Sequence, residues 1–370
     1  MLCGSAVGLA LLAIWVLSVS GKQQTKCHCM NLALCQPVIR NEQVKKDKEV
    51  LIFDNEGKDW KHYMWSNITI IVASQQYDPE LLCHAHAKGV QLLMRVTIPP
   101  VNTIWTKQKM SEWVNKQVKL VKTNQMDGIN LHLDQVVTKY SPESQKITEA
   151  VQQIFTAFHK EISQSKVIVN VPWSPQCIYG RCYEYAKLNA NSDSLFVMSY
   201  LMHSTSTEDC FAKPNSPYSK VSSGITEYIN LGISPSKLIL GVPWFGVDYT
   251  CKKLHEDGGC ELINKSDKET CNVKSGDTIP YKTVMTLMPR ALSQKFWKND
   301  LQVPSFTYMS QGKSHEVWYD NPQSIAAKAS LVKMFKLAGI GVWAGNFLNY
   351  SSNATVAMQT QNMWSALYNS

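Results

Sequence analysis

Polar side chains occupy alternate positions in the stretch Asp127-Gly-Ile-Asn-Leu-His-Leu-Asp134. If this stretch is a β-strand, Asn130, His132 and Asp134 share one face of it. A polar row on a buried strand costs free energy unless its groups are hydrogen-bonded or do chemistry. A carboxyl group can donate a proton and an imidazole can exchange one. The spacing favours function for Asp134, whereas Asn130 also fits a hydrogen-bonded ladder inside the protein.

Short β-rich segments alternate with helical stretches along the whole chain. Eight such segments followed by helices are typical of an α/β fold, the (β/α)8 TIM barrel, in which the carboxyl ends of the strands meet at one mouth. We therefore expect the polar row to point toward that mouth. The eight expected strands are 50–53, 67–72, 90–98, 128–133, 167–171, 195–200, 238–242 and 339–343.

The clearest helix signal covers residues 142–162, where Ser141 is the expected N-cap and Pro142 the first helical residue. By contrast, the interval between residues 242 and 339 is far longer than an ordinary connection in a barrel. It contains three cysteines and several turn residues. We predict an inserted α+β subdomain at 248–315, after the seventh strand, which walls one side of the mouth.

The beginning of the chain predicts a signal peptide at residues 1–20, because it is uncharged and contains the apolar run 6–19. An uncleaved anchor is the alternative, although this run is shorter than the ~20 residues that span a bilayer. The mature chain, 21–370, is then expected to be one barrel with no membrane span. With 370 residues and 44% hydrophobic composition it can bury a large core.

Ten cysteines remain after residue 20, and an even number in a secretory protein favours disulfides. A metal cluster at Cys27-His28-Cys29 with Cys35 is the alternative, but the spacing fits no common zinc pattern. Acceptor motifs for N-glycosylation begin at Asn67, Asn264, Asn349 and Asn353. We expect no metal and no cofactor. The net charge of +8 is scattered, which argues against a nucleic-acid partner, and a monomer is the default expectation.

The stretch 127–134 resembles the Asp-Gly-x-Asp-x-Asp-x-Glu strand of the family-18 glycoside hydrolases. Further segments resemble that family in the same order along the chain: Val197-Met-Ser-Tyr200, Gly241-Val-Pro-Trp-Phe-Gly246, Val317-Trp-Tyr-Asp-Asn321 and Gly339-Ile-Gly-Val-Trp343. The resemblance is strongest to the lysosomal branch that trims the chitobiose core of asparagine-linked glycans. It implies N-acetylglucosamine oligosaccharides as ligands.

In that family the N-acetyl oxygen of the substrate attacks the anomeric carbon, so no protein nucleophile is needed. A Glu protonates the leaving oxygen, an Asp two residues earlier stabilises the positive oxazolinium, and a Tyr orients the N-acetyl group. By position these catalytic residues become Asp134, His132 and Tyr200. Asp is about 1 Å shorter than Glu, and such misplacement can cost about a hundredfold in rate. A protonated His132 would oppose the developing positive charge.

The resemblance also implies substrate-binding residues near the strand ends. Trp343 corresponds to the floor beneath the cleaved sugar, whereas Leu201 replaces a substrate-binding Asp. Packing of the barrel top is an alternative role for the aromatic residues. A metal site at His132 and Asp134 is disfavoured because no third ligand is expected to converge there. The expected substrate-binding residues are Asp127, Asn130, Met198, Trp173, Trp244 and Trp343.

These observations predict a secreted or lysosomal barrel that acts on or binds N-acetylglucosamine oligosaccharides, with hydrolysis lost or severely impaired at His132 and Asp134. An active lysosomal exo-glycosidase that degrades asparagine-linked glycan remnants is one alternative. A non-catalytic interaction protein with a vestigial cleft is another.

Overall fold

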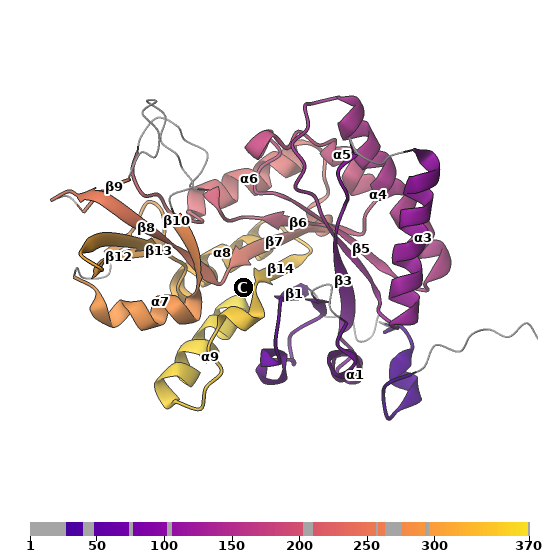
Figure 1. Ribbon diagram of the computed structural model, residues 1–370, viewed down its shortest axis with the longest axis horizontal. Helices are drawn as coiled ribbons and strands as arrows, with labels where there is room; N and C mark the ends of the chain where they lie inside the picture. Colours follow the sequence, from indigo (N-terminus) through magenta and orange to yellow (C-terminus); the bar gives the residue numbers. More distant parts are fainter. Residues whose placement is uncertain are drawn as a thin grey trace, which may run out of the picture.

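A closed barrel of eight parallel strands forms the centre of the molecule (Figure 1). The computed structural model describes residues 27–39, 48–73, 77–101, 106–202, 210–256, 258–262, 276–292 and 296–368. The strand order around the barrel is β1-β14-β7-β6-β5-β4-β3-β2. Its strands are β1 (Glu49–Asp54), β2 (Ile70–Ala73), β3 (Gln91–Thr97), β4 (Gly128–His132), β5 (Lys166–Pro172), β6 (Ser194–Met198), β7 (Leu238–Pro243) and β14 (Gly339–Trp343).

The predicted (β/α)8 barrel is confirmed, and each of the eight expected segments overlaps one barrel strand. Strands of a parallel barrel are buried on both faces, which explains their nearly continuous runs of Val, Ile and Leu. In β7 every residue is buried. A separate apolar cluster fills the barrel interior with Leu51, Phe53, Phe196 and Ile239.

Helices cover the outside of the barrel. The predicted helix at 142–162 is α4 (Pro142–Glu161), where the Ser141 hydroxyl accepts a hydrogen bond from the backbone N–H of Ser144. Its apolar face, including Ile147 and Ile154, is fully buried. The other helices are α1 (Pro79–Ala87), α3 (Lys107–Thr123), α5 (Tyr185–Ala190), α6 (Tyr218–Asn230), α7 (Tyr281–Leu287), α8 (Pro322–Met334) and α9 (Ala354–Tyr368).

A second, antiparallel sheet is inserted between β7 and β14, the seventh and eighth barrel strands. In Figure 1 this sheet and α7 project from one side of the barrel, away from α3 and α4. Its strands extend on both sides of the segment 248–315 predicted from the sequence. They are β8 (Phe245–Leu254), β9 (Cys260–Leu262), β10 (Gly276–Pro280), β11 (Phe296–Lys298), β12 (Val303–Ser310) and β13 (Lys313–Trp318), in the order β10-β8-β13-β12-β11 with β9 on β8.

Oxidised cysteines hold several segments in place. Between pairs of described residues, disulfides join Cys27 to Cys35, Cys29 to Cys83, Cys177 to Cys182 and Cys251 to Cys260. The alternative of a metal cluster at the first cysteines is therefore wrong, because their sulfur atoms are used in disulfides. The predicted signal peptide, Asn264 and Cys271 lie outside the described residues. Among the described helices, none combines the length and apolar character required to cross a membrane.

Candidate active site

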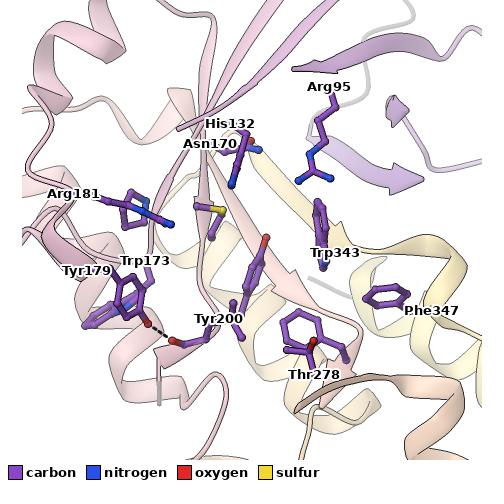
Figure 2. A pocket seen from close by; sticks show the side chains of 14 residues that line it. Arg95, His132, Asn170, Trp173, Tyr179, Arg181, Tyr200, Thr278, Trp343 and Phe347 are labelled. Carbon is purple, nitrogen blue, oxygen red and sulfur yellow. Dashed lines mark hydrogen bonds between the residues drawn. The ribbon is translucent and has the colours of Figure 1, made fainter. Parts of the chain in front are cut away.

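A cavity of about 300 Å³ opens at the carboxyl ends of the barrel strands (Figure 2). Its walls come from several barrel strands, from the loop after β5 and from the inserted sheet. The lining residues are Arg95, His132, Asn170, Pro172, Trp173, Tyr179, Arg181, Met198, Tyr200, Leu201, Phe245, Thr278, Trp343 and Phe347. Apolar and aromatic side chains predominate, as in most small-molecule sites.

His132 is the last residue of β4 and lies between Thr97 of β3 and Asn170 of β5 in the parallel register. Its ring lines the cavity, and its Nδ1 atom is buried without a hydrogen-bond partner in the part of the chain that the structure describes. Burial, followed by the positive charge of Arg95, lowers the pKa of His132 to about 4. The imidazole is therefore neutral at pH 5, and the expected conflict between an imidazolium and a positive intermediate arises only in more acidic solution.

Asp134 does not line the cavity, although the alternating pattern predicts that it faces the same way as His132. The difference arises because β4 ends at His132, so the two-residue alternation is not maintained. Directly after Asp134, the side chain of Gln135 accepts a hydrogen bond from the Val101 N–H and donates to the carbonyl of Ile98. Asp134 itself is exposed. In this arrangement its carboxylate is not placed to donate a proton inside the cavity.

Three residues expected at the site from the sequence, Tyr200, Met198 and Trp343, line the cavity. In Figure 2 the Tyr200 hydroxyl points toward the middle of the group, between His132 and Trp343. Its ring packs edge-on against Phe245, with the ring centroids 5.5 Å apart. Burial raises the pKa of Tyr200, so its hydroxyl remains a hydrogen-bond donor at physiological pH.

Trp173 also lines the cavity, from the residue directly after β5. Its indole Nε1 is buried without a hydrogen-bond partner among the described residues. An indole N–H can only donate, so this group could serve an acceptor on a bound ligand.

Trp244 is not brought to the cavity. Its side chain has no exposed surface, and it packs edge-on against Trp364 of α9 with the ring centroids 4.8 Å apart. The ring therefore stabilises the contact between the barrel and the last helix. A direct contact of Trp244 with sugar is not compatible with this burial.

Asp127 lies at the opposite end of β4 from the cavity, before the first residue of the strand. Its carboxylate accepts hydrogen bonds from the backbone N–H groups of Val38 and Leu92, at 2.7 Å each, and its Oδ2 lies 2.9 Å from His86 Nε2. Only 1% of Asp127 is exposed. This aspartate therefore organises the closed end of the barrel and does not reach the cavity.

Asn130 is also fully buried, one layer below the cavity. Its side-chain amide forms two hydrogen bonds with that of Asn170, at 2.7 and 2.9 Å. Of this pair, only Asn170 is a lining residue. The geometry matches the ladder inside the barrel that was the alternative to a binding role.

Sequence reasoning missed two cations of the cavity, Arg95 and Arg181. Arg95 interrupts the apolar strand β3 and faces the barrel interior beside Asn130. Its guanidinium carbon lies 4.4 Å from the centroid of the Trp343 ring. An arginine in a buried strand is a signal that could have identified it, whereas Arg181 belongs to a loop with no comparable pattern.

Asp54 is the buried carboxyl group that most resembles a substitute acid, because burial raises its pKa to about 6. It ends β1, and its Oδ1 accepts a hydrogen bond of 2.5 Å from the Tyr63 hydroxyl. Asp54 is absent from the lining of the main cavity and borders a neighbouring depression with Lys58 and Asp78. It is therefore not positioned at the site beside His132.

Comparison with known proteins bears on this geometry. The sequence profile of Glycosyl hydrolases family 18 matches residues 102–346, which include most of the barrel and the inserted sheet. The chain belongs to this family. Among similar family members, di-N-acetylchitobiase of Mus musculus is 41% identical over 343 residues, covering 92% of both chains. Di-N-acetylchitobiase of Homo sapiens is 39% identical and covers 93% of this chain and 88% of its own length.

Solved structures of family-18 enzymes have the same fold. A chitinase from Cycas revoluta superposes with a TM-score of 0.66 at 15% identity, covering 86% of this chain and 99% of its own. The carboxyl-terminal domain of a chitinase from Desulfitobacterium hafniense gives a TM-score of 0.65 at 18% identity, covering 85% and 99%. The resemblance inferred from the sequence motifs is thus confirmed at the level of family and fold.

Proposed function

We propose that this protein binds N-acetylglucosamine oligosaccharides of the chitobiose-core type and that its hydrolytic activity is lost or severely impaired. One observation carries the proposal: no Asp or Glu is among the described residues that line the cavity, where His132 stands at the position of the family aspartate. The similar mouse and human proteins are named di-N-acetylchitobiases, which supports this class of ligand.

The loss of activity follows from the charges that the reaction needs. Substrate-assisted hydrolysis requires a protonated acid at the leaving oxygen and an anion near the oxazolinium. A neutral His132 supplies no anion, and the Asp134 carboxylate is exposed outside the cavity lining. Both electrostatic contributions are thereby removed from the reacting centre.

Binding depends on features that do not require these charges. Trp343, Tyr200 and Phe245 present aromatic surfaces to the cavity. Such surfaces pack well against the apolar faces of sugar rings, and nearby donors orient the polar groups. A chain that has lost the acid can therefore retain affinity for the sugar.

The proposed location is the secretory pathway, with the lysosome or the extracellular space as the destination. Disulfides persist in oxidising compartments, and four are seen in the described part of the chain. The acceptor residues Asn349 and Asn353 belong to the described surface loop before and at the start of α9.

The test is turnover of a fluorogenic chitobioside by the purified protein between pH 4 and 7, beside the double variant His132→Asp, Asp134→Glu. We expect no detectable turnover by the parent and at most a small gain in the variant, because residue 134 lies outside the cavity lining. The double variant His28→Asp, Asp300→Glu makes the same chemical changes at exposed positions and should gain nothing. Efficient turnover by the parent would overturn the loss of activity and favour the active exo-glycosidase.

Binding is measured separately, by calorimetric titration of the parent with chitobiose and chitotriose. Saturable binding is expected. Its absence would remove the proposed sugar ligand and favour an interaction protein with a vestigial cleft.

A further inference from the structure

Among the described residues that line the cavity, neither Asp nor Glu is present, and the basic side chains are those of Arg95, Arg181 and His132. The two arginines carry positive charge, whereas His132 is neutral above its lowered pKa. Figure 2 shows the two arginines approaching the cavity from opposite sides, with His132 and Tyr200 between them. A neutral amino sugar does not require this arrangement, because its hydroxyl and amide groups carry no net charge.

Arg95 is the more enclosed cation. Its guanidinium lies against the Trp343 ring, at the position expected for the floor of the sugar site. Burial lowers its pKa, but an arginine remains protonated in proteins. Within the described part of the chain, no ion pair with a carboxylate compensates this charge. A buried guanidinium that has only an aromatic partner favours an anionic ligand.

Arg181 is held beside the cavity by its loop. The loop is closed by the Cys177–Cys182 disulfide, and Arg181 forms a β-bridge with Val137. Its Nε is buried and makes no hydrogen bond to any described residue. A fixed guanidinium with an unused donor is suited to bind the paired oxygens of a carboxylate or a sulfate.

Both arginines affect the pKa of His132. After burial, Arg95 and Arg181 both lower its pKa, and only Asp134 opposes them. Asp134 is exposed, so solvent screens its negative charge. The walls of the cavity are mostly apolar, so they screen the positive charges of the two arginines less. The potential inside the cavity is therefore positive.

The size of the cavity limits the ligand. At about 300 Å³ it lies at the lower end of the range of about 300 to 1,000 Å³ for ligand pockets, which suits one sugar ring. Aromatic residues supply a surface for that ring, and the two guanidinium groups supply charge.

We propose that the cavity selects a terminal N-acetylated amino sugar that carries an anionic substituent, either a sulfate ester or a carboxylate, which Arg95 binds with support from Arg181. This inference rests on the proposed function, because it assumes that an N-acetylated sugar occupies the cavity. It narrows that function from neutral to acidic glycans.

The experiment is calorimetric titration of the full chain with N-acetylglucosamine, N-acetylglucosamine 6-sulfate and N-acetylmuramic acid. We expect at least one acidic sugar to bind tenfold or more tightly than the neutral one. The sulfate and the carboxylate arms then identify which anion is preferred. Arg95→Gln should reduce the ratio of acidic to neutral affinity at least tenfold, Arg181→Gln should reduce it less, and Arg95→Lys should retain part of it.

Arg290→Gln is the matched control, because it removes an exposed guanidinium from the inserted subdomain, outside the cavity lining, and should retain the full ratio. Circular dichroism of each variant verifies folding. Equal affinity of the parent for neutral and acidic sugars would overturn the inference and leave sugar binding intact. An acidic preference that survives Arg95→Gln would also overturn it, since the anion would then bind elsewhere. Absence of binding by all three sugars, with chitotriose still bound, would overturn the inference alone, whereas absence of chitotriose binding as well would refute the proposed function.

Discussion

Asn130 and Asn170 exchange two hydrogen bonds between the neighbouring strands β4 and β5, with Asn170 opposite His132 in the register. Each amide nitrogen donates to the side-chain oxygen of the other residue. Asn170→Ala should therefore leave the side-chain oxygen of the fully buried Asn130 without its donor, and its amide nitrogen with only the 3.5 Å hydrogen bond to the carbonyl of Ile168. We expect the free energy of unfolding to fall by about 1 to 3 kcal/mol. Urea denaturation with intact disulfides measures this loss. Asn299→Ala changes an exposed turn residue and should cost less than about 0.5 kcal/mol, and equal losses would argue against the reciprocal pair.

Substitution of Asp127 should lower the stability of the protein without changing its affinity for sugar. Asp127→Ala removes the acceptor of two backbone N–H groups and the hydrogen-bond partner of His86. Burial alone would lower the pKa of His86, but the Asp127 carboxylate raises it. We expect a loss of about 3 to 5 kcal/mol in the free energy of unfolding, because the remaining groups are buried. The folded variant should bind sugar with the affinity of the parent. A specific loss of affinity at unchanged stability would instead support a binding role for Asp127.

Trp343, the last residue of β14, and Trp244, the residue after β7, should respond differently to substitution. Trp343→Ala removes an aromatic wall of the cavity, so chitotriose affinity should fall at least tenfold, which corresponds to about 1.4 kcal/mol. Trp244→Phe retains an aromatic ring against Trp364 and should lower the melting temperature without changing affinity. Titration and thermal denaturation of both variants measure the contrast. A loss of chitotriose affinity in Trp244→Phe, with unchanged affinity in Trp343→Ala, would instead place Trp244 in the binding site.

His132 should make the protein less stable in acid. Its pKa is about 4 in the folded chain and about 6.5 in an unfolded one. Between these values the unfolded chain binds more protons, so the free energy of unfolding rises with pH. From pH 7 to pH 4.5 the parent should lose about 2 kcal/mol more than His132→Asn. Urea denaturation at both pH values measures this difference, and parallel pH profiles would show that His132 is not buried as described.

The barrel was predictable from the sequence because its strands are apolar on both faces and alternate with helices. The caps of α4 were equally clear, since Ser141 and Pro142 act within one turn of the helix. Both signals are local. The family motifs added the position of the site, and the cavity does contain His132 and Tyr200.

The distribution of site residues was less predictable because it depends on distant contacts. The burial of Trp244 is set by Trp364, which is 120 positions away in the sequence, and nothing near Trp244 indicates this. The orientation of Asp134 depends on where β4 ends, and a repeating pattern does not define that end. Arg181 reaches the cavity from a loop without periodicity, so only the folded chain reveals its place.

The barrel is closed by pairing between its first and last strands, with Glu49 opposite Gly339. During synthesis, nearly 300 residues follow β1 before β14, its pairing partner, has been translated. The entropy lost in closing so long a segment opposes this pairing. Trp343 belongs to that final strand. A nascent chain thus acquires this aromatic wall of the cavity in the same step that completes the barrel, so a ligand of the cavity cannot assist folding until translation is almost finished.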